Sequence, residues 1–394
     1  MCAKRILACP VTHNFPSRTY GKTYNIAKRI ELPNTKIELC VGVASQDLES
    51  STVTVTEILK GGKKGYYLRA LWYAQKSINS GNIDLYHHMN LNYNWFNPLL
   101  VGQMYDEDLP ILIGPAQAPH IITDDELEKI VDSKIPFETP DNILKVLSKG
   151  LNSSKDCFDT PRFKLFKKTL NAADTVVVVN KDTKNIYSQF MPEDKIEVVP
   201  LGVDLDYFEK GETRKENTIV SVGYLNRRKG FDILLRAMNT ISDSFPESSL
   251  EIFGDGPQMD DLKRLAISEG VYDSVTFHGH VDQSKVKDAL KRATVFVHPS
   301  RSESFSPVRL EAMASGCPMV VTNIVGADEM VRDAKEGYVV EPTPDDIANS
   351  VCEILQSPEL VTAMSRSSRD RAEQKYDWDK ITDRYESIYQ NLLN

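Results

Sequence analysis

The stretch Glu303-Ser-Phe-Ser-Pro-Val-Arg-Leu-Glu311-Ala-Met-Ala-Ser-Gly-Cys-Pro318 is the most informative part of this sequence. Ser306 is a favourable N-cap and Pro307 a favourable first helical residue, so we expect a helix over residues 308–315. The first turn of that helix, beginning at Val308, would leave backbone N–H groups without partners, and such groups bind a phosphate well. The stretch therefore predicts an anion site at a helix N-terminus.

Two carboxylates flank this expected anion site. Glu303 would lie on the loop before the helix and Glu311 one turn into it, so both could accept hydrogen bonds from hydroxyl groups. A sugar nucleotide has the matching layout, because its diphosphate lies between sugar hydroxyls and ribose hydroxyls. Arg309 opposes the helix macrodipole, which a bound anion would relieve; the alternative is a side chain that extends into water.

The composition is that of an ordinary globular enzyme. A chain of 394 residues exceeds the size at which one hydrophobic core usually stops growing, so two domains are expected. The longest apolar runs are too short to span a membrane and the first ten residues lack a signal-like segment, which predicts a cytoplasmic location. The six cysteines are scattered without Cys-x-x-Cys spacing, which indicates reduced thiols and no zinc site.

The formal net charge of −9 is unevenly distributed. Residues 1–205 carry 24 basic and 24 acidic residues, so the excess negative charge belongs to the remainder. Residues 1–76 carry 12 basic residues against 5 acidic ones, and their lysines are mixed with aromatic residues such as Tyr66 and Trp72. That mixture suits an anionic membrane face or a lipid-phosphate acceptor, or else a core helix with a basic outer edge.

Strand-like and helix-like segments alternate along the chain, which is typical of parallel sheets with crossover helices. In the first half we expect strands at 4–8, 36–43, 83–87, 110–114, 175–179 and 196–199, and helices at 20–30 and 66–79. In the second half we expect strands at 218–222, 250–253, 275–278, 295–298, 319–322 and 338–340, and helices at 231–244, 259–269, 285–293 and 308–315. A last helix is expected at 378–393, where apolar residues recur at helical spacing.

The opening stretch resembles the signature of retaining glycosyltransferases of family 4, also described as glycosyl transferases group 1. That signature is Glu, seven residues, then Glu-Ala-Met-Ala-x-Gly-x-Pro. Ser221–Gly230 is similar to the family's basic diphosphate loop, and Val198–Asp204 resembles its domain junction. Further matching segments follow in the family's order: Ile252–Pro257, Val275–Gly279 and Val295–Ser300. The resemblance is dense in the second half of the chain and loose in the first.

The resemblance implies a fold class as well, the α/β architecture called GT-B, with two doubly wound Rossmann-like domains facing a cleft. Residues 1–205 would form the N-terminal acceptor domain, and residues 206–375 would form the nucleotide-sugar-binding domain. A closing helix within residues 376–394 would pack back on the first domain.

The basic cluster Arg227, Arg228 and Lys229 falls at a strand-to-helix turn, where open α/β sheets bind ligands. Fixed cations there would neutralise the charge on a departing diphosphate. The family usually has an arginine directly after the loop's first glycine, Gly223, and this chain has Tyr224 instead. Arg227 or Arg228 is the candidate replacement, whereas Lys229 matches the family's lysine. The alternative is a solvated run of charges at a turn.

The first half offers weaker candidates for the donor site. Gly21 is the single glycine after the first strand that is a candidate for close approach to the diphosphate. His120 is a candidate contact for the donor sugar, Gln117 is its rival, and a loop histidine without a role is the alternative. His87 and His88, at the end of an expected strand, either line the cleft or pack at a sheet edge.

Asp204-Leu-Asp206 imitates a metal-binding Asp-x-Asp motif, but it falls at the expected domain junction. The lysine and arginines of the diphosphate loop already supply the electrophilic charge that a divalent ion would provide. We therefore expect neither a metal nor a cofactor.

The resemblance implies a metal-independent retaining hexosyltransferase that moves a sugar from a nucleoside diphosphate to an acceptor hydroxyl. Lys229 and the N–H groups around Val308 would hold the diphosphate, Glu311 the ribose hydroxyls and Glu303 the donor sugar. The acceptor is expected to be a glycan, a lipid-linked molecule or a small molecule, with peripheral association at the inner membrane face and no nucleic-acid partner. The alternatives are a nucleotide-sugar 2-epimerase on the same fold and a non-catalytic partner subunit, which Tyr224 suggests.

Overall fold

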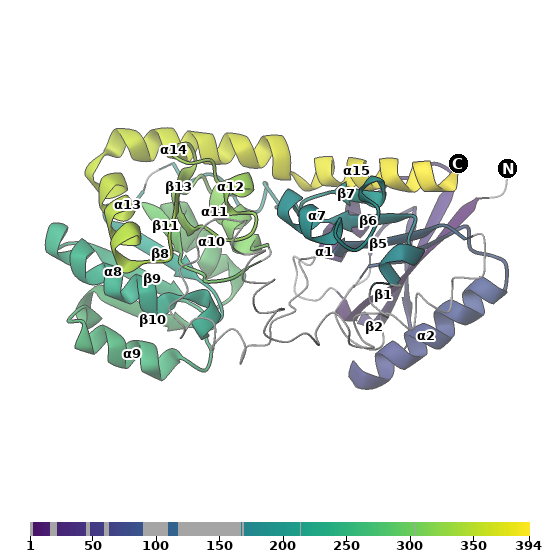
Figure 1. The fold of residues 1–394 in the computed structure, drawn as a ribbon, viewed down its shortest axis with the longest axis horizontal. Helices are drawn as coiled ribbons and strands as arrows, with labels where there is room; N and C mark the ends of the chain where they lie inside the picture. Colours follow the sequence, from purple (N-terminus) through teal and green to yellow (C-terminus); the bar gives the residue numbers. More distant parts are fainter. Residues whose placement is uncertain are drawn as a thin grey trace. The chain divides into compact units, whose positions relative to one another are not determined.

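A computed structural model describes residues 3–15, 22–44, 48–58, 63–89, 109–116, 167, 169–212, 214–303 and 305–394 (Figure 1). The chain divides into two compact units. The first comprises Met1–Ile121, Val146–Leu201 and Trp378–Asn394, and the second contains Gly202–Asp377. From the sequence we expected the divisions after residues 205 and 375. Each unit is an α/β structure built on a parallel sheet.

The first unit has a seven-stranded sheet in the order β3-β2-β1-β4-β5-β6-β7. Its strands are β1 Lys4–Phe15, β2 Thr35–Ala44, β3 Val53–Glu57, β4 Leu85–His88, β5 Ile111–Ala116, β6 Thr175–Val178 and β7 Ile196–Val198. All neighbouring strands are parallel, and β4 and β5 are buried along their whole length. Strand β3 was missed in the sequence, although its residues Val-Thr-Val-Thr-Glu alternate in the manner of a half-buried strand.

The helices of the first unit include one from the far end of the chain. They are α1 Lys22–Arg29, α2 Lys63–Asn79, α7 Lys181–Tyr187, the 3₁₀ turn η1 Glu193–Lys195 and α15 Trp378–Leu393. Helix α15 buries the apolar positions expected from its spacing, and Tyr389 lies against β4, where its hydroxyl is 2.6 Å from Nδ1 of His87. Arg29 Nε donates to Asp379 Oδ1 at 2.9 Å, which ties α1 to α15.

The second unit has a six-stranded parallel sheet in the order β10-β9-β8-β11-β12-β13. Its strands are β8 Thr218–Val222, β9 Ser249–Phe253, β10 Val275–Gly279, β11 Val295–His298, β12 Met319–Thr322 and β13 Gly337–Val340. The strand order reverses direction between β8 and β11, which are paired neighbours in the middle of the sheet. Ligands of open α/β sheets bind beyond the carboxyl ends of the strands at such a switch point.

Helices connect the successive strands of the second unit and follow the last strand. They are α8 Phe231–Ser244, α9 Met259–Ser268, α10 Gln283–Arg292, α11 Pro307–Ala314, α12 Ala327–Met330, α13 Pro344–Gln356 and α14 Pro358–Arg371, with 3₁₀ turns η2 Arg227–Lys229 and η3 Tyr272–Ser274 and the π turn η4 Ala372–Tyr376. Thr343 caps α13 and Ser357 caps α14 through their side chains, each followed by proline at the first helical position.

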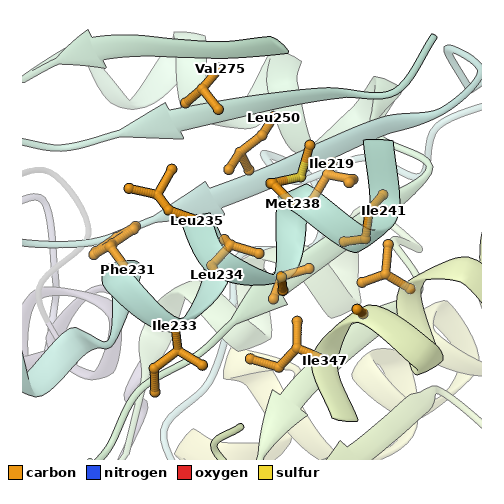
Figure 2. Packing of buried hydrophobic residues seen from close by; sticks show 14 of the residues in the cluster. Ile219, Phe231, Ile233, Leu234, Leu235, Met238, Ile241, Leu250, Val275 and Ile347 are labelled. Atoms are coloured by element: carbon orange, nitrogen blue, oxygen red, sulfur yellow. The ribbon is translucent and has the colours of Figure 1, made fainter. Parts of the chain in front are cut away.

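The core of the second unit packs around α8. Figure 2 shows Phe231, Leu234 and Met238 of this helix among side chains from the sheet and from α13. The strand contacts come from Ile219, Leu250 and Val275, and α13 contributes Ile347. This core holds the sheet and its crossover helices as one body, so the loops at the carboxyl ends of β8 and β11 are mounted on a rigid frame.

Two arginines join the segment before β8 to the C-terminal end of α11. Arg369 Nη1 donates to the carbonyl oxygens of Phe208 at 2.8 Å and Ala314 at 2.9 Å. Arg214 Nη2 donates to the Ser315 carbonyl oxygen at 2.9 Å, and its Nη1 donates to that of Ala293 at 2.8 Å. The last carbonyl groups of α11, which have no partners inside the helix, are thus satisfied by cations that also suit the helix dipole.

Candidate functional site

The loop after β8 is held by close backbone contacts. Asn226 accepts a hydrogen bond from the Lys229 N–H through its side chain and so starts the turn η2. Gly230 follows in a left-handed conformation with φ +68°, and a Cβ at this position would lie 2.0 Å from the Pro299 carbonyl oxygen. Only glycine permits this approach, which brings the loop after β8 against the loop after β11.

Lys229, Arg228 and Glu303 meet at the switch point. The Lys229 ammonium forms an ion pair with Glu303 Oε2, and Arg228 Nη1 lies 3.1 Å from the same oxygen and 2.9 Å from the Ser302 carbonyl oxygen. The side chains of Lys229 and Glu303 are 14% and 11% exposed, so the pair is largely withdrawn from water. Residues 74 positions apart in the chain are therefore joined in one charged cluster.

The charges of this cluster act strongly on one another. Burial raises the pKa of the Glu303 carboxyl, but the charges of Lys229 and Arg228 outweigh burial and hold this pKa below its usual value. Burial lowers the pKa of the Lys229 ammonium, and the attraction of Glu303 offsets only part of that effect. The Glu303 carboxyl is therefore a carboxylate at neutral pH.

Arg301 holds the backbone of the basic turn Arg227–Lys229. Its guanidinium donates to Asp232 at 2.6 and 2.7 Å, and Nη1 also donates to the Arg227 carbonyl oxygen at 2.8 Å. The Arg228 carbonyl oxygen accepts from the Arg301 N–H at 2.8 Å and from the Ser300 hydroxyl at 3.1 Å. These contacts hold the backbone of residues 227–229, so their side chains start from fixed positions.

Helix α11 begins as expected, with Ser306 at the N-cap and Pro307 at the first position. The Ser306 side chain makes no cap hydrogen bond, and its hydroxyl lies 3.2 Å from Nε2 of His298. The Arg309 N–H is also not free, since it donates to the Ser306 carbonyl oxygen at 3.1 Å. Among the described residues, none is recorded to accept a hydrogen bond from the Val308 N–H, as expected for the first turn of a helix.

The Arg309 side chain does not extend into water, which was the alternative considered from the sequence. It is 1% exposed, and its Nε and Nη2 donate to Nδ1 of His298 at 3.1 and 3.0 Å. Burial lowers the pKa of the Arg309 guanidinium to about 10, and the nearby charge of Glu303 raises it. A buried cation therefore lies in the first turn of α11, close enough to Glu303 for their charges to interact.

Glu311 lies on the next turn of α11 and is partly buried. Its Oε1 accepts a hydrogen bond from Gln283 Nε2 of α10 at 3.0 Å. Burial raises the pKa of its carboxyl to about 7, although the Gln283 hydrogen bond opposes the rise. The pKa values of the two carboxyl groups are thus shifted in opposite directions, with Glu303 just before α11 and Glu311 within it. Such a contrast in pKa is typical of functional sites.

Of the other candidates in this unit, Gly223 precedes the basic turn and donates its N–H to the Phe253 carbonyl oxygen at 2.9 Å. Tyr224, at the position where the resembling family usually has arginine, is 59% exposed. Asp204 accepts the Tyr207 N–H at 3.0 Å and so stabilises a turn. Among the described residues, no group of three or more His, Cys, Asp or Glu side chains is arranged to hold a metal ion.

The candidate site residues of the first half fall into two groups. Gly21, His120 and Gln117 lie outside the described residues. His87 and His88 are fully buried within the sheet, which agrees with the packing alternative for these histidines. Our reading of the sequence missed His298 and Gln283, which contact the predicted site residues. His298 ends a strand beside the switch point, and that position was the available signal.

Residues 204–371 match the family described as glycosyl transferases group 1. A GDP-mannose-dependent alpha-(1-6)-phosphatidylinositol monomannoside mannosyltransferase of Mycobacterium tuberculosis is 32% identical to this chain over 231 residues. The alignment covers 54% of this chain and 60% of the mycobacterial protein, so the chain spans about three fifths of that relative's length.

Solved structures resemble the whole chain. The sucrose-phosphate synthase of Thermosynechococcus elongatus has a TM-score of 0.73 and 19% identity and covers 99% of both chains. HepE of Anabaena in complex with UDP has a TM-score of 0.69 and 14% identity, covering 98% of this chain and 100% of HepE. These likenesses confirm the expected fold class, two doubly wound Rossmann-like units of the GT-B type.

Proposed function

We propose, from the premise that residues 204–371 form a glycosyl transferases group 1 domain, that the protein moves a sugar from a nucleoside diphosphate to an acceptor hydroxyl. The observation that carries this proposal is the meeting of Lys229, Arg228 and Glu303 beside the start of α11. Three types of group suited to a sugar nucleotide, namely cations, carboxylates and the N–H groups of a helix start, come together at one switch point.

The chemistry follows from where charge develops. When the bond between the sugar and the diphosphate breaks, negative charge accumulates on the departing phosphate oxygens. Arg228 is fixed by Glu303 and by the Ser302 carbonyl, and Lys229 is fixed by Glu303, so both are oriented before the reaction and do not need to reorganise. A single pre-oriented group of this kind contributes about 10²- to 10³-fold to a rate. We infer that these cations do the work of a divalent ion and that the reaction needs neither metal nor cofactor.

The two carboxylates would hold the ends of the donor. Glu311 would accept hydrogen bonds from ribose hydroxyls, and Glu303 would contact the donor sugar. The Val308 N–H, with Ser306 and Pro307 shaping the entry of the helix, would bind the diphosphate. Retention of the anomeric configuration belongs to this proposal and would come from attack on the same face as the leaving phosphate. His120 and Gly21 remain predictions for the part of the donor site contributed by the first half.

A lipid-linked acceptor is the second part of the proposal. The mycobacterial relative is named for a phosphatidylinositol mannoside acceptor. Helix α2 carries an exposed Trp72, 63% accessible, with the Lys76 ammonium 5.2 Å from its ring centroid. A tryptophan beside lysines suits an anionic membrane surface, which supports peripheral association at the inner membrane face. No described helix is long and apolar enough to cross a membrane.

The test begins with donor binding. Purified protein is titrated with GDP, UDP and ADP and their sugar derivatives, starting with GDP-mannose, by calorimetry and thermal unfolding. We expect one nucleotide to bind, and Lys229→Ala to weaken its affinity at least tenfold, whereas the exposed Lys335→Ala in the same unit leaves it unchanged. If none of these nucleotides binds, the proposal that the protein is a glycosyltransferase is refuted. Conversion of the sugar nucleotide into another one without any acceptor would favour the epimerase alternative.

The membrane part is tested separately. Binding to vesicles that contain phosphatidylinositol is compared for the wild type and Trp72→Ala. Co-sedimentation that falls in the variant, while nucleotide binding is retained, supports the lipid surface. Equal co-sedimentation of the two proteins would remove α2 from the proposal.

A further inference from the structure

We propose that Arg309, His298 and Ser306 form a buried hydrogen-bonded chain that aims the Ser306 hydroxyl proton at the diphosphate of the donor. Arg309 and His298 are positioning residues in this chain, and Ser306 is the residue that contacts the ligand. The inference rests on the proposed function, because it names the role of a second set of residues in the same site.

The chain starts with a charge that forms no direct ion pair with any described residue. The guanidinium of Arg309 is buried, and its hydrogen bonds go to Nδ1 of the His298 imidazole, which is not an anion. In the part of the chain that the structure describes, no carboxylate oxygen lies within 4.0 Å of its nitrogens. A buried charge without an opposite partner is costly, and the position of Arg309 in the first turn of α11 adds to that cost.

The proton positions along the chain follow from the donors. An arginine can only donate, so Nδ1 of His298 must accept from both Nε and Nη2 of Arg309. The imidazole is then neutral and carries its proton on Nε2. That N–H donates to the Ser306 hydroxyl oxygen 3.2 Å away. The Ser306 oxygen is used as an acceptor, so its own proton remains available to a third group.

The site around this proton has fewer anions than cations. Arg228, Lys229 and Arg309 bring three positive charges together, against the single carboxylate of Glu303. Ser306 is 3% exposed, and no described residue accepts its proton. A diphosphate supplies both missing elements, because its oxygens accept the hydroxyl proton and its charge balances the cations.

The neutral form of His298 is secured by its surroundings. Burial lowers the pKa of this imidazole, and the charges of Arg309, Lys229 and Arg228 lower it further, well below its usual range. A protonated His298 would face three cations. The direction of the chain, from Arg309 to Ser306, therefore does not reverse when the ligand leaves.

The experiment measures affinity for the nucleoside diphosphate that binds the wild type, and for inorganic pyrophosphate, in Ser306→Ala and Arg309→Met. Each variant is expected to lose about tenfold in affinity for both probes, and the double variant about the same tenfold. Arg309→Lys, which keeps one donor to His298, is expected to recover most of the loss. Thermal unfolding of Arg309→Met is expected at the same temperature as wild type or higher, because an unpaired buried charge has been removed.

A second readout tests the proton positions without a ligand. In protein labelled with ¹⁵N-histidine, and with the His298→Asn variant to assign its signal, two-bond ¹H–¹⁵N spectra should show the tautomer protonated at Nε2. In Arg309→Met the His298 signal should show that both tautomers are populated and exchange with each other. Full additivity of Ser306→Ala and Arg309→Met, or a wild-type His298 protonated at Nδ1, would overturn the inference.

The outcomes separate this inference from the proposed function. Binding of pyrophosphate with the expected variant effects, but of no nucleoside diphosphate, would refute the proposed function and leave the chain supported. Binding of a nucleoside diphosphate with unchanged affinity in Ser306→Ala would refute the chain alone. Binding of neither probe would refute both.

Discussion

The raised pKa of Glu311 makes the stability of the protein depend on pH in a defined way. In the folded protein this carboxyl ionises near pH 7, whereas 4.5 is its usual value, and the unfolded chain is expected to be close to that value. Between these values the folded state binds more protons than the unfolded state, so the free energy of unfolding falls as pH rises. At about 1.4 kcal/mol per pKa unit, the difference between the two pKa values corresponds to a change of about 3 kcal/mol in the free energy of unfolding. Partial exposure of the Glu311 side chain reduces the expected change to about 2 kcal/mol.

Replacement by glutamine removes the ionisation and keeps an oxygen that can accept from Gln283. Urea unfolding followed by far-ultraviolet circular dichroism is compared for Glu311→Gln and wild type at pH 4.5, 6, 7 and 8. We expect the variant to gain about 2 kcal/mol relative to wild type between pH 4.5 and 8, because the other titrating groups cancel in the difference. The exposed Glu247→Gln in the same unit is the control and should show no such trend. A difference between Glu311→Gln and wild type that is constant with pH would refute the reasoning.

Three further changes test other parts of the structure. Glu303→Gln should bind nucleoside diphosphate as tightly as wild type or a few-fold more tightly, because a carboxylate that competes with the ligand for the cations is removed. Its turnover should fall about 10²-fold. Calorimetry measures the affinity and initial rates measure the turnover, and a tenfold loss of affinity would contradict this prediction. Tyr389→Phe should lower the free energy of unfolding by about 1 kcal/mol, whereas Tyr385→Phe, whose hydroxyl has no described partner, should not, as urea titrations can check. Gly230→Ala should cost about 2 kcal/mol or more because its Cβ meets Pro299, and a smaller cost in thermal or urea unfolding would count against the close contact.

Most of the fold could be predicted because its signals are local. The strand 218–222, the helix 231–244 and the strand 295–298 were predicted with the bounds that the structure has, since apolar runs alternate there with clear breaks. Strand β3 was missed because three of its five residues are threonine or glutamate and it lies at the edge of its sheet. An edge strand buries less, so its apolar signal is weaker.

The site was predictable where the residues are adjacent in sequence and less so where side chains choose partners across the fold. Lys229 and Glu303 come together as the motif order and the parallel topology predict. The contact between the Ser306 hydroxyl and His298 could not be predicted, because capping statistics do not include a histidine on the preceding strand. Nor could the burial of Arg309 be read from sequence, since its partner His298 is eleven residues away on another element.

The arginine contacts at the end of α11 bear on how the protein can be divided for separate study. A fragment that starts at Thr218 would discard Arg214 and the Phe208 carbonyl group, so α11 would end without one of its cations and Arg369 would lose an acceptor. A fragment of residues 202–377 keeps both arginines and also the pairing of Val203 with Asp377. Residues 202–217 thus behave as part of the folded domain, and trimming them would loosen the far end of the helix whose start is the proposed phosphate site.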